Sequence, residues 1–488
     1  MRFVSRRAAL AVAIAAAFPA IRDAHAVRLG TDGLGQALIF PYYSAQTAVG
    51  SPLNTYLSVV NHTADAKAIR VRFREGRMGA LVLEFNLFLS PNDVWTGAVV
   101  PSGDGAMLLT RDVSCTDPPI PSQGVVFPNY GYTGALGDGA GTGLDRTREG
   151  YVEMIEMATL TGTSAAAITH NSAGVPANCA AVQGFASVAT APPSGGLSGT
   201  FTLINVANGM EFSTNAEALA ELSKQAFFRA GADPYPDWNA AEIDPVSVVV
   251  ANGSVYRSIW SHPVDAVSAV LMRSAWQGEY VLDAATDSRT DIVLTFPARR
   301  FYANASGANA PFTKSAWWSP DCTPSPAAVK GEVVVTPYYN RESRGPPPSG
   351  FDDYPLPPVT PQQICATAAV VPVGNGPGFT STSPSVGLLG SHTGGFTWGV
   401  FTVQSYFQNG WFRIGASSAI PISSAASSMR MDGRTGAVVS GPHSYSGLPV
   451  VGFTVRSMTN GQLTCSAGRC QGNYGGAFPL KFSRTISP

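Results

Sequence analysis

The stretch "AIRVRFREGRMGALVLEFNLFL", residues 68–89, decides the fold class because its apolar side chains alternate along two consecutive segments. In the first segment, 68–74, the apolar side chains share one face and the three arginines share the other. In the second segment, 81–89, every second residue is Leu or Phe. A period of two over this length is typical of half-buried antiparallel strands. The inward residues are Ile69, Val71, Phe73, Leu81, Leu83, Phe85, Leu87 and Leu89, and the outward ones include Arg70, Arg72 and Arg74.

The residues that follow predict a corner of the same sheet. "SPND", residues 90–93, has the proline position of a type I turn, and Asp93 is expected to hold that turn. Trp95 then begins the next strand and contributes to the core. Glu84 lies on the face opposite the leucines, where the arginines of 70–74 are its expected partners.

Other segments extend this pattern along the chain. Further strand-like runs occur at 55–60, 246–260 and 291–297. They predict a mainly β fold of antiparallel β-sandwich (immunoglobulin-like) domains with long loop insertions and a few short helices. "TNAEALAELSKQ", residues 214–225, is the expected helix because Thr214 and Glu217 form a capping box. The segment 264–276 fits a helix and a strand equally well.

The length of 488 residues exceeds the usual single domain of about 100–200 residues. We expect a signal peptide at 1–26 and an N-terminal sandwich domain with loop insertions at 27–210. A middle β-rich region with a short helix, packed on the first domain, follows at 211–344. A proline-rich loop or linker at 345–361 precedes a C-terminal β-rich region at 362–488.

The N-terminus has the three parts of an export signal. "MRFVSRR" is basic, "AALAVAIAAAFPA" is apolar, and "AHA" before Val27 is a small-residue cleavage site. General secretion is favoured, although Arg6 and Arg7 also resemble a twin-arginine signal. The protein is therefore expected at the cell surface, outside the cell or in the periplasm. No later stretch predicts a transmembrane helix.

The charge balance excludes one class of partner. Charged residues make up 13% of the chain and the formal net charge is −1. Nucleic-acid binding usually requires a basic patch or domain, so no nucleic-acid partner is expected.

Six cysteines follow the predicted signal peptide, and an even number in an exported protein indicates disulfides. Pairing in sequence order is the simplest interpretation, because each bond then closes a loop within one region. The candidates are Cys115, Cys179, Cys322, Cys365, Cys465 and Cys470.

The acidic segment "RTREGYVEMIEM", residues 146–157, is the most suggestive site for chemistry. Glu149, Glu153 and Glu156 share a face if the segment is helical, which would give paired carboxylates for acid–base catalysis. In a strand, Glu153 and Glu156 point to opposite faces, and pairing with the arginines of 72–77 is then favoured. Asp93 is a further candidate carboxylate. No catalytic residue is assigned.

Two aspartate clusters raise the possibility of calcium as the sole cofactor, because flexible oxygen-rich loops bind this ion. Neither cluster matches an established calcium loop, so solvated turns are favoured. The candidates are Asp138, Asp145, Asp283, Asp287 and Asp291.

Motifs of nucleophilic catalysis are absent: neither G-x-S-x-G nor H-E-x-x-H occurs. Exposed aromatic side chains can bind sugars, and Trp317 and Trp318 in "SAWWSP" are the expected place for such a site. Packing in a core or interface is the favoured alternative for these two residues.

Several motifs together resemble a family of exported, functionally uncharacterised bacterial proteins. The resemblance covers most of the mature chain and implies a common fold and export, without catalytic residues to transfer. The motifs are "FPYYS" (40–44), "NTYLSVVNHT" (54–63), "FREGR" (73–77), "LEFNLFLSPNDVWTG" (83–97), "RTREGYVEMIEM" (146–157), "VDAVSAVLM" (264–272) and "DIVLTFPARRFY" (291–302).

Two functional hypotheses follow from these features. The first is an exported cell-surface or extracellular structural or interaction protein, with itself or envelope components as partners. The second is a secreted hydrolase that acts on polysaccharide through paired carboxylates. A carboxylate pair facing a groove would favour the hydrolase, whereas Glu153 paired to arginine in a closed core would count against it.

Overall fold

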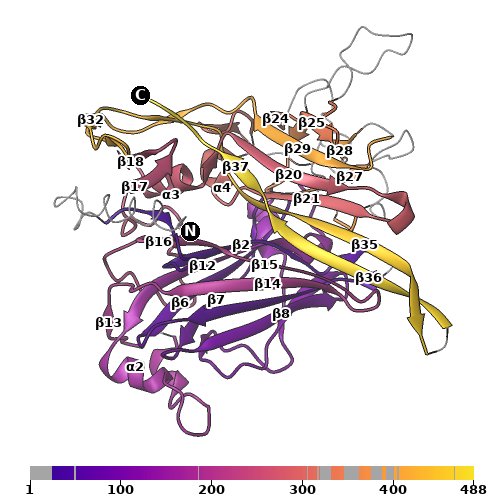
Figure 1. Ribbon diagram of the computed structural model, residues 1–488. Helices are drawn as coiled ribbons and strands as arrows, with labels where there is room; N and C mark the ends of the chain where they lie inside the picture. The colour runs from indigo at the N-terminus through magenta and orange to yellow at the C-terminus, as the bar shows by residue number, and fades with distance from the viewer. Residues whose placement is uncertain are drawn as a thin grey trace, which may run out of the picture.

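The computed structural model describes residues 25–48, 51–184, 186–304, 306–315, 318, 331–345, 362–374, 387–391, 401–403, 406–466 and 468–488. Four sheets of five to eight strands form most of this structure. Figure 1 shows the N-terminal strands in the lower half and most of the C-terminal strands in the upper half, with a long hairpin crossing on the right. The predicted fold class, antiparallel β-sandwich layers with long loops and few short helices, is confirmed.

The first sheet contains the segment that decided the fold. Its order is β1, β16, β2, β12, β6, β7, β10, with β13 also paired to β12. The strands are β1 (Arg28–Leu29), β2 (Ala37–Ser44), β6 (Ala66–Glu75), β7 (Leu81–Leu89), β10 (Thr116–Asp117), β12 (Glu149–Leu160), β13 (Thr190–Ala191) and β16 (Glu217–Ala220).

The second sheet packs on the inner face of the first, and its order is β11, β9, β8, β5, β14, β15. Val71, Leu87 and Trp95 are buried between the two sheets, as the alternation predicted. The strands are β5 (Asn54–Asn61), β8 (Val94–Ser102), β9 (Gly105–Leu109), β11 (Val125–Val126), β14 (Leu197–Asn205) and β15 (Met210–Asn215).

The third and fourth sheets form the C-terminal half. The third has the order β26, β24, β29, β20, β37, with β25 paired to β29; the fourth has the order β28, β27, β21, β35, β36. The third sheet comprises β20 (Ala275–Val281), β24 (Glu332–Val335), β25 (Tyr338–Asn340), β26 (Gln362–Ile364), β29 (Asn409–Ala416) and β37 (Lys481–Ser483). The fourth comprises β21 (Arg289–Thr295), β27 (Ala368–Gly374), β28 (Phe401–Thr402), β35 (Val451–Cys465) and β36 (Gly468–Pro479).

Strand β21 is buried on both faces and joins the two halves. Val293 packs in the same core as Val71, whereas Ile292 and Leu294 pack in the core beneath the third sheet. Near-continuous apolar sequence in "DIVLTF" is explained by this double burial.

Smaller elements complete the chain. The helices are α2 (Gly162–Ile168), α3 (Pro263–Leu271) and α4 (Arg299–Tyr302). A separate sheet holds β17 (Val246–Ala251), β18 (Ser254–Ile259), β31 (Met429–Asp432) and β32 (Val438–Ser440). The remaining short strands are β3 (Thr47–Ala48), β4 (Ser51–Pro52), β19 (Met272–Arg273), β22 (Ala303–Asn304), β23 (Gly307–Ala308), β30 (Ile422–Ser423), β33 (Ser444–Ser446), β34 (Leu448–Pro449) and β38 (Thr485–Ser487).

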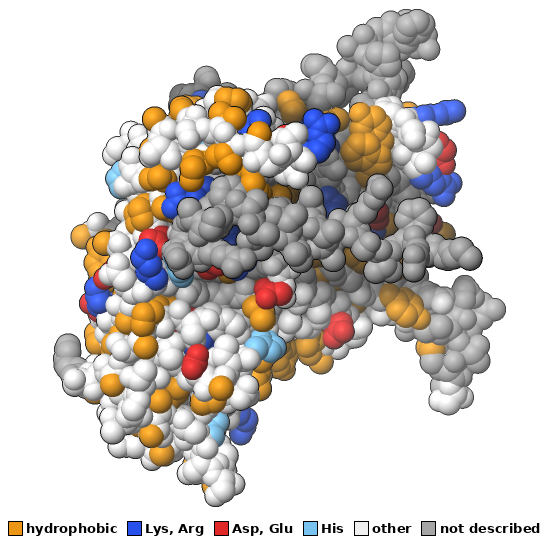
Figure 2. All heavy atoms as spheres, turned by 60° about the vertical axis from the view of Figure 1, so that its left-hand side comes forward, with side chains coloured by type: hydrophobic (Ala, Val, Ile, Leu, Met, Phe, Trp, Pro, Cys, Tyr) orange, Lys and Arg blue, Asp and Glu red, His pale blue; other side chains and the backbone are white. Residues whose placement is uncertain are grey.

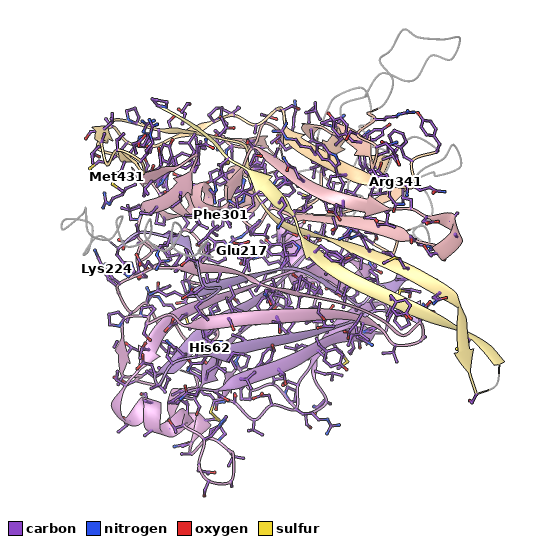
Figure 3. The ribbon with its side chains drawn as sticks, viewed as in Figure 1. His62, Glu217, Lys224, Phe301, Arg341 and Met431 are labelled. Atoms are coloured by element: carbon purple, nitrogen blue, oxygen red, sulfur yellow. A yellow bond between two sulfur atoms is a disulfide. The ribbon has the colours of Figure 1, made fainter. Side chains whose placement is uncertain are left out.

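The helix predicted at 214–225 is wrong. Thr214 lies in β15, where it pairs with Phe201. Glu217 is the first residue of β16 and lies near the centre of the molecule (Figure 3). Buried Leu219 is held between β1 and β2. Pairing on both sides outweighs the local capping signal, because helix propensity is only a small term per residue. Both alternatives for 264–276 occur in succession, since α3 is followed by β19 and β20.

The turn at 90–93 is also different in detail from the prediction. Asn92 has a φ of 54°, and type I requires a negative φ at this position. Asp93 nevertheless holds the turn, since its Oδ2 accepts a hydrogen bond from the Ser90 backbone N–H at 3.0 Å.

One predicted disulfide, Cys115–Cys179, is confirmed. Cys365 and Cys470 are also disulfide-bonded, and no described cysteine is free. Their predicted partners, Cys322 and Cys465, have side chains outside the described residues. Most of the predicted signal peptide and residues 346–361 of the predicted linker also lie outside the described residues. Among the described helices, none has the length and apolar character needed to cross a membrane.

Candidate functional site

The arginines of β6 form an ion-pair ladder on the outer face of the first sheet. Arg72 Nε lies 3.0 Å from Glu84 Oε2, and Arg70 Nη1 lies 3.6 Å from the same oxygen. Arg74 Nε lies 2.7 Å from Glu153 Oε2. Cross-strand register explains the ladder, because Arg72 pairs with Glu84 on β7 and with Glu153 on β12. The predicted contact between Glu84 and the arginines is confirmed.

The outward face on which these arginines lie, as predicted, is itself covered by another part of the chain. Residues 229–238, which we call the covering segment, lie over them. Arg70 donates to the carbonyl oxygens of Ala230 and Gly231 at 2.8 and 3.0 Å, and Arg72 donates to those of Pro234 and Pro236. A buried guanidinium needs such acceptors, because an unpaired buried charge is costly.

Glu153 is enclosed by the same segment. It is 1% exposed, and its Oε1 accepts a hydrogen bond of 2.7 Å from Trp238 Nε1. Burial would raise its pKa, but the positive charges of Arg74 and Arg300 outweigh burial and hold the pKa of Glu153 below its ordinary value. Both oxygens of this ionised carboxylate are therefore engaged by the protein, and its burial closes it off from solvent.

Glu156 faces the opposite side of β12, as predicted for a strand. Its Oε1 lies 3.0 Å from Lys67 Nζ, and its two oxygens accept backbone N–H groups of Ser194 and Gly195. Lys67 uses its other donors on Ser194 Oγ and the Gly195 carbonyl oxygen, at 2.5 and 2.7 Å. Burial, which outweighs Lys67, raises the pKa of Glu156.

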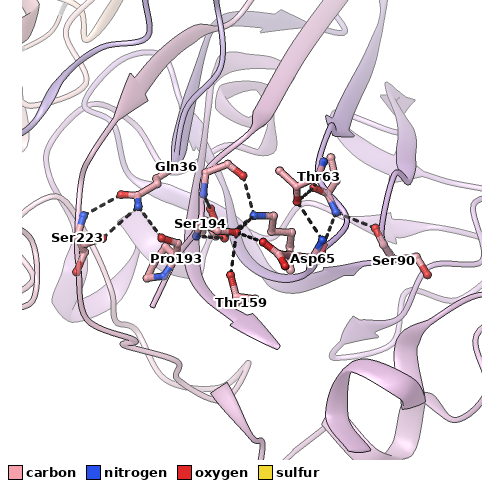
Figure 4. A network of polar contacts seen from close by, with 12 residues as sticks. Gln36, Thr63, Asp65, Ser90, Thr159, Pro193, Ser194 and Ser223 are labelled. Carbon is pink, nitrogen blue, oxygen red and sulfur yellow. Dashed lines mark hydrogen bonds and ion pairs between the residues drawn. The ribbon is translucent and has the colours of Figure 1, made fainter. Parts of the chain in front are cut away.

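Ser194 is the centre of this polar network (Figure 4). Its Oγ donates to Asp65 Oδ2 at 2.7 Å and accepts from Thr159 Oγ1 at 3.0 Å. These bonds attach the loop before β14 to the ends of β6 and β12. A loop anchor is the role that this geometry supports.

Glu149 lies apart from the other two glutamates. It accepts hydrogen bonds from Tyr42 Oη at 2.7 Å, Ser391 Oγ at 2.6 Å and Gln46 Nε2 at 3.1 Å. A register shift between Gly150 and Val152 separates it from the regular part of β12. The three glutamates therefore occupy three separate buried sites and do not form a facing pair.

The predicted calcium candidates are also partly engaged with arginine. Asp138 makes a two-point contact with Arg146 at 2.7 and 2.8 Å, and Asp145 lies 2.5 Å from Arg77. No group of three or more His, Cys, Asp or Glu side chains suited to a metal occurs in the described part of the chain.

The other three aspartates lie in the C-terminal half. Asp283 caps a short turn by accepting the Ala285 N–H at 2.9 Å, and Asp287 lies 3.2 Å from Arg289. Asp291 is buried in β21 and accepts the Leu389 N–H at 2.9 Å. Burial raises the pKa of Asp291 to about 6, against the lowering effect of the Leu389 and Leu388 backbone donors.

A solvent-facing groove lies where the chain leaves β36 and enters β37, and its lining residues come from the fourth and third sheets. Its volume is about 390 Å³, within the range of small-molecule sites. Strand β37 pairs with β20 only over residues 275–277, so the edge of β20 opens beyond that point. We call this space, lined by Gln277, Glu279, Trp411, Arg456, Phe478 and Lys481, the aromatic groove.

The sequence did not identify the aromatic groove, because its residues come from four separate segments. One pattern in the sequence could have indicated part of this site. In "NGWFRIG", exposed Trp411 and Arg413 alternate with buried Phe412 and Ile414, so the strand presents an aromatic and a basic side chain on its outer face. Trp318 from the expected sugar site instead lies beneath the Arg77 guanidinium at 4.0 Å, and Trp317 lies outside the described residues.

Comparison with known proteins adds no relative. The chain matches no protein-family model, and neither the curated proteins nor the solved structures provide a match.

Proposed function

We propose that this protein is an exported structural or interaction protein of the cell surface or extracellular space, which binds envelope components through the aromatic groove. The proposal depends on the contrast between the buried glutamates and the exposed aromatic residues. The candidate glutamates are buried in hydrogen-bonded sites, whereas exposed aromatic side chains occur in an open groove. Exposed aromatic residues in a hollow are typical of binding sites.

The surface composition supports an interaction role. On the face in Figure 2, charged side chains are scattered among apolar and uncharged ones. The chain has few charged residues, so electrostatic repulsion between copies or with envelope material is small. The Cys115–Cys179 disulfide is of a kind that persists in oxidising compartments outside the cytoplasm.

An edge strand supports self-association. Strand β32 ends the four-stranded sheet in the described structure, and Val438 and Val439 on it are 50% and 55% exposed. An exposed apolar edge presents free backbone groups that pair readily with another strand.

The hydrolase alternative has no such support. Glu153 is paired to Arg74 inside a closed core, which is the arrangement that counts against acid–base catalysis. Among the described residues that line the aromatic groove, the only carboxylate is Glu279, which is paired with Arg456.

Cell fractionation with an antibody to the native protein tests the proposal. We expect the protein in the surface or culture fraction, and binding of purified protein to isolated envelopes. Electron microscopy of both samples would detect ordered assemblies. A purely cytoplasmic, monomeric protein without envelope binding would refute the proposal.

A further inference from the structure

The aromatic groove is built on a rigid aromatic pair. Trp411 stacks on Tyr339 with ring centroids 4.5 Å apart and an interplanar angle of 19°. The two residues are cross-strand neighbours on β29 and β25, so the backbone register holds the stack. Trp411 is still 40% exposed. A ring that is fixed before binding loses little conformational entropy when a ligand packs on it.

A second aromatic side chain lines the groove. Phe478 is 43% exposed, and the Arg456 guanidinium lies 3.7 Å from its ring centroid. Arg456 Nη1 also donates to Glu279 Oε2 at 2.8 Å, which connects the hairpin β35–β36 to β20. Arg456 Nε has no hydrogen-bond partner among the described residues. The cation–π contact and the ion pair therefore hold Phe478 in the wall of the groove that Trp411 also lines.

Beside these rings lies a row of polar side chains with surplus positive charge. Gln277 on β20 pairs with Arg413 on β29 and with Lys481 on β37, so the three side chains lie in one row on one face. Neither Arg413 nor Lys481 has an ion-pair partner in the described structure, whereas Glu279 is already neutralised by Arg456.

These features fit one ligand chemistry better than others. The C–H face of a sugar ring is apolar and packs on a flat aromatic side chain, while its hydroxyl groups need partners such as the Gln277 amide. A carboxylate on the ring would meet Lys481, which lines the groove, and Arg413 lies next to the groove as the cross-strand neighbour of Gln277. We propose that the aromatic groove binds a polysaccharide whose sugar rings carry carboxylates. This inference rests on the proposed interaction function and specifies its ligand.

Isothermal titration calorimetry of the purified mature protein with alginate oligosaccharides tests the inference. We expect saturable binding that weakens with added salt, because charge attraction across an open groove is screened. Trp411→Ala should weaken binding roughly tenfold, as for a central aromatic contact. Lys481→Gln should weaken it several-fold and reduce the salt dependence.

Matched controls use side chains that do not line the groove. Tyr56→Ala removes an exposed ring from β5 of the second sheet. Lys224→Gln removes an exposed lysine on the side of the molecule opposite Arg341, which follows β25 (Figure 3). Both controls should bind alginate like the unaltered protein. Circular dichroism identifies any misfolded variant, and Gln277→Ala then replaces Trp411→Ala as the test of the groove.

Three outcomes would overturn the inference: no binding to alginate, equal binding to neutral dextran, or equal binding to polyglutamate of the same charge. Equal polyglutamate binding would identify a site for acidic peptides. The cell fractionation experiment tests the proposed location, independently of the ligand. Envelope association without alginate binding refutes only the ligand, whereas alginate binding by a cytoplasmic protein refutes only the proposed location.

Discussion

Arg74 Nε lies 2.7 Å from Glu153 Oε2, and both residues are almost completely buried under the covering segment. Trp238 donates to the other carboxylate oxygen, so the ion pair also attaches the covering segment to the first sheet. Acidic residues that look catalytic in the sequence therefore hold a distant part of the chain in place.

Replacing Glu153 with Gln should be strongly destabilising. The substitution leaves the Arg74 guanidinium buried without its counter-charge, and breaking a buried pair in this way costs about 3–5 kcal/mol of unfolding free energy. Urea unfolding followed by tryptophan fluorescence measures the change. As a control, Glu342→Gln removes an exposed partner of Arg341 and should change stability by less than about 1 kcal/mol. Equal effects of the two substitutions would contradict the structural role of Glu153.

Asp291 should make the protein less stable as pH rises from 4 to 7. Burial raises its pKa to about 6, whereas the carboxyl group of an unfolded chain titrates near about 4. Between these values the folded protein holds one more proton than the unfolded chain, so the unfolding free energy falls with increasing pH. The total loss is about 3 kcal/mol and is nearly complete by about pH 7, roughly one unit above the folded-state pKa.

Asp291→Asn tests this prediction, because an amide oxygen can still accept the Leu389 N–H but does not titrate. We expect the variant to be more stable relative to the unaltered protein at pH 7 than at pH 4. Thermal unfolding at a series of pH values measures the difference. Parallel pH profiles for the two proteins would show that Asp291 does not titrate in this range.

The sequence predicted the sheet but not what lies on it. The alternation of Val71 and Leu87 is local and reports directly which face is buried. Whether Arg72 faces water depends on the covering segment, which lies more than 150 residues further along the chain. The alternation in β6 shows which side chains are polar, but it does not show whether another segment covers them.

The errors at 214–225 and in the groove have related causes. Thr214 and Glu217 satisfy the local rule for a helix start, but pairing with β14 and β2 decides their conformation. Trp411 on the third sheet and Phe478 on the fourth line the same groove only because the two sheets come together there. Sites assembled in this way leave no spacing motif in the sequence.

Removing the Cys115–Cys179 disulfide should destabilise the folded state. The two residues are separated by 64 positions, and closing a loop of this length restricts the unfolded chain by about 4 kcal/mol in the chain-entropy model. The double variant Cys115→Ser/Cys179→Ser should therefore have a clearly lower urea midpoint under oxidising conditions. Dithiothreitol should lower the midpoint less in the double variant than in the unaltered protein. An unchanged midpoint in the double variant would contradict the prediction.

Val439→Lys on β32 should weaken self-association. A charged side chain on an exposed edge strand opposes pairing with a second strand, because the charge would lose water in the new interface. Light scattering coupled to size-exclusion chromatography should detect a dissociation constant at least about tenfold larger than for the unaltered protein. Val206→Lys changes a valine that is even more exposed, in the turn between β14 and β15, and should leave association unchanged. If the unaltered protein is monomeric at high concentration, or if both variants associate equally, the edge of β32 is not a self-association surface.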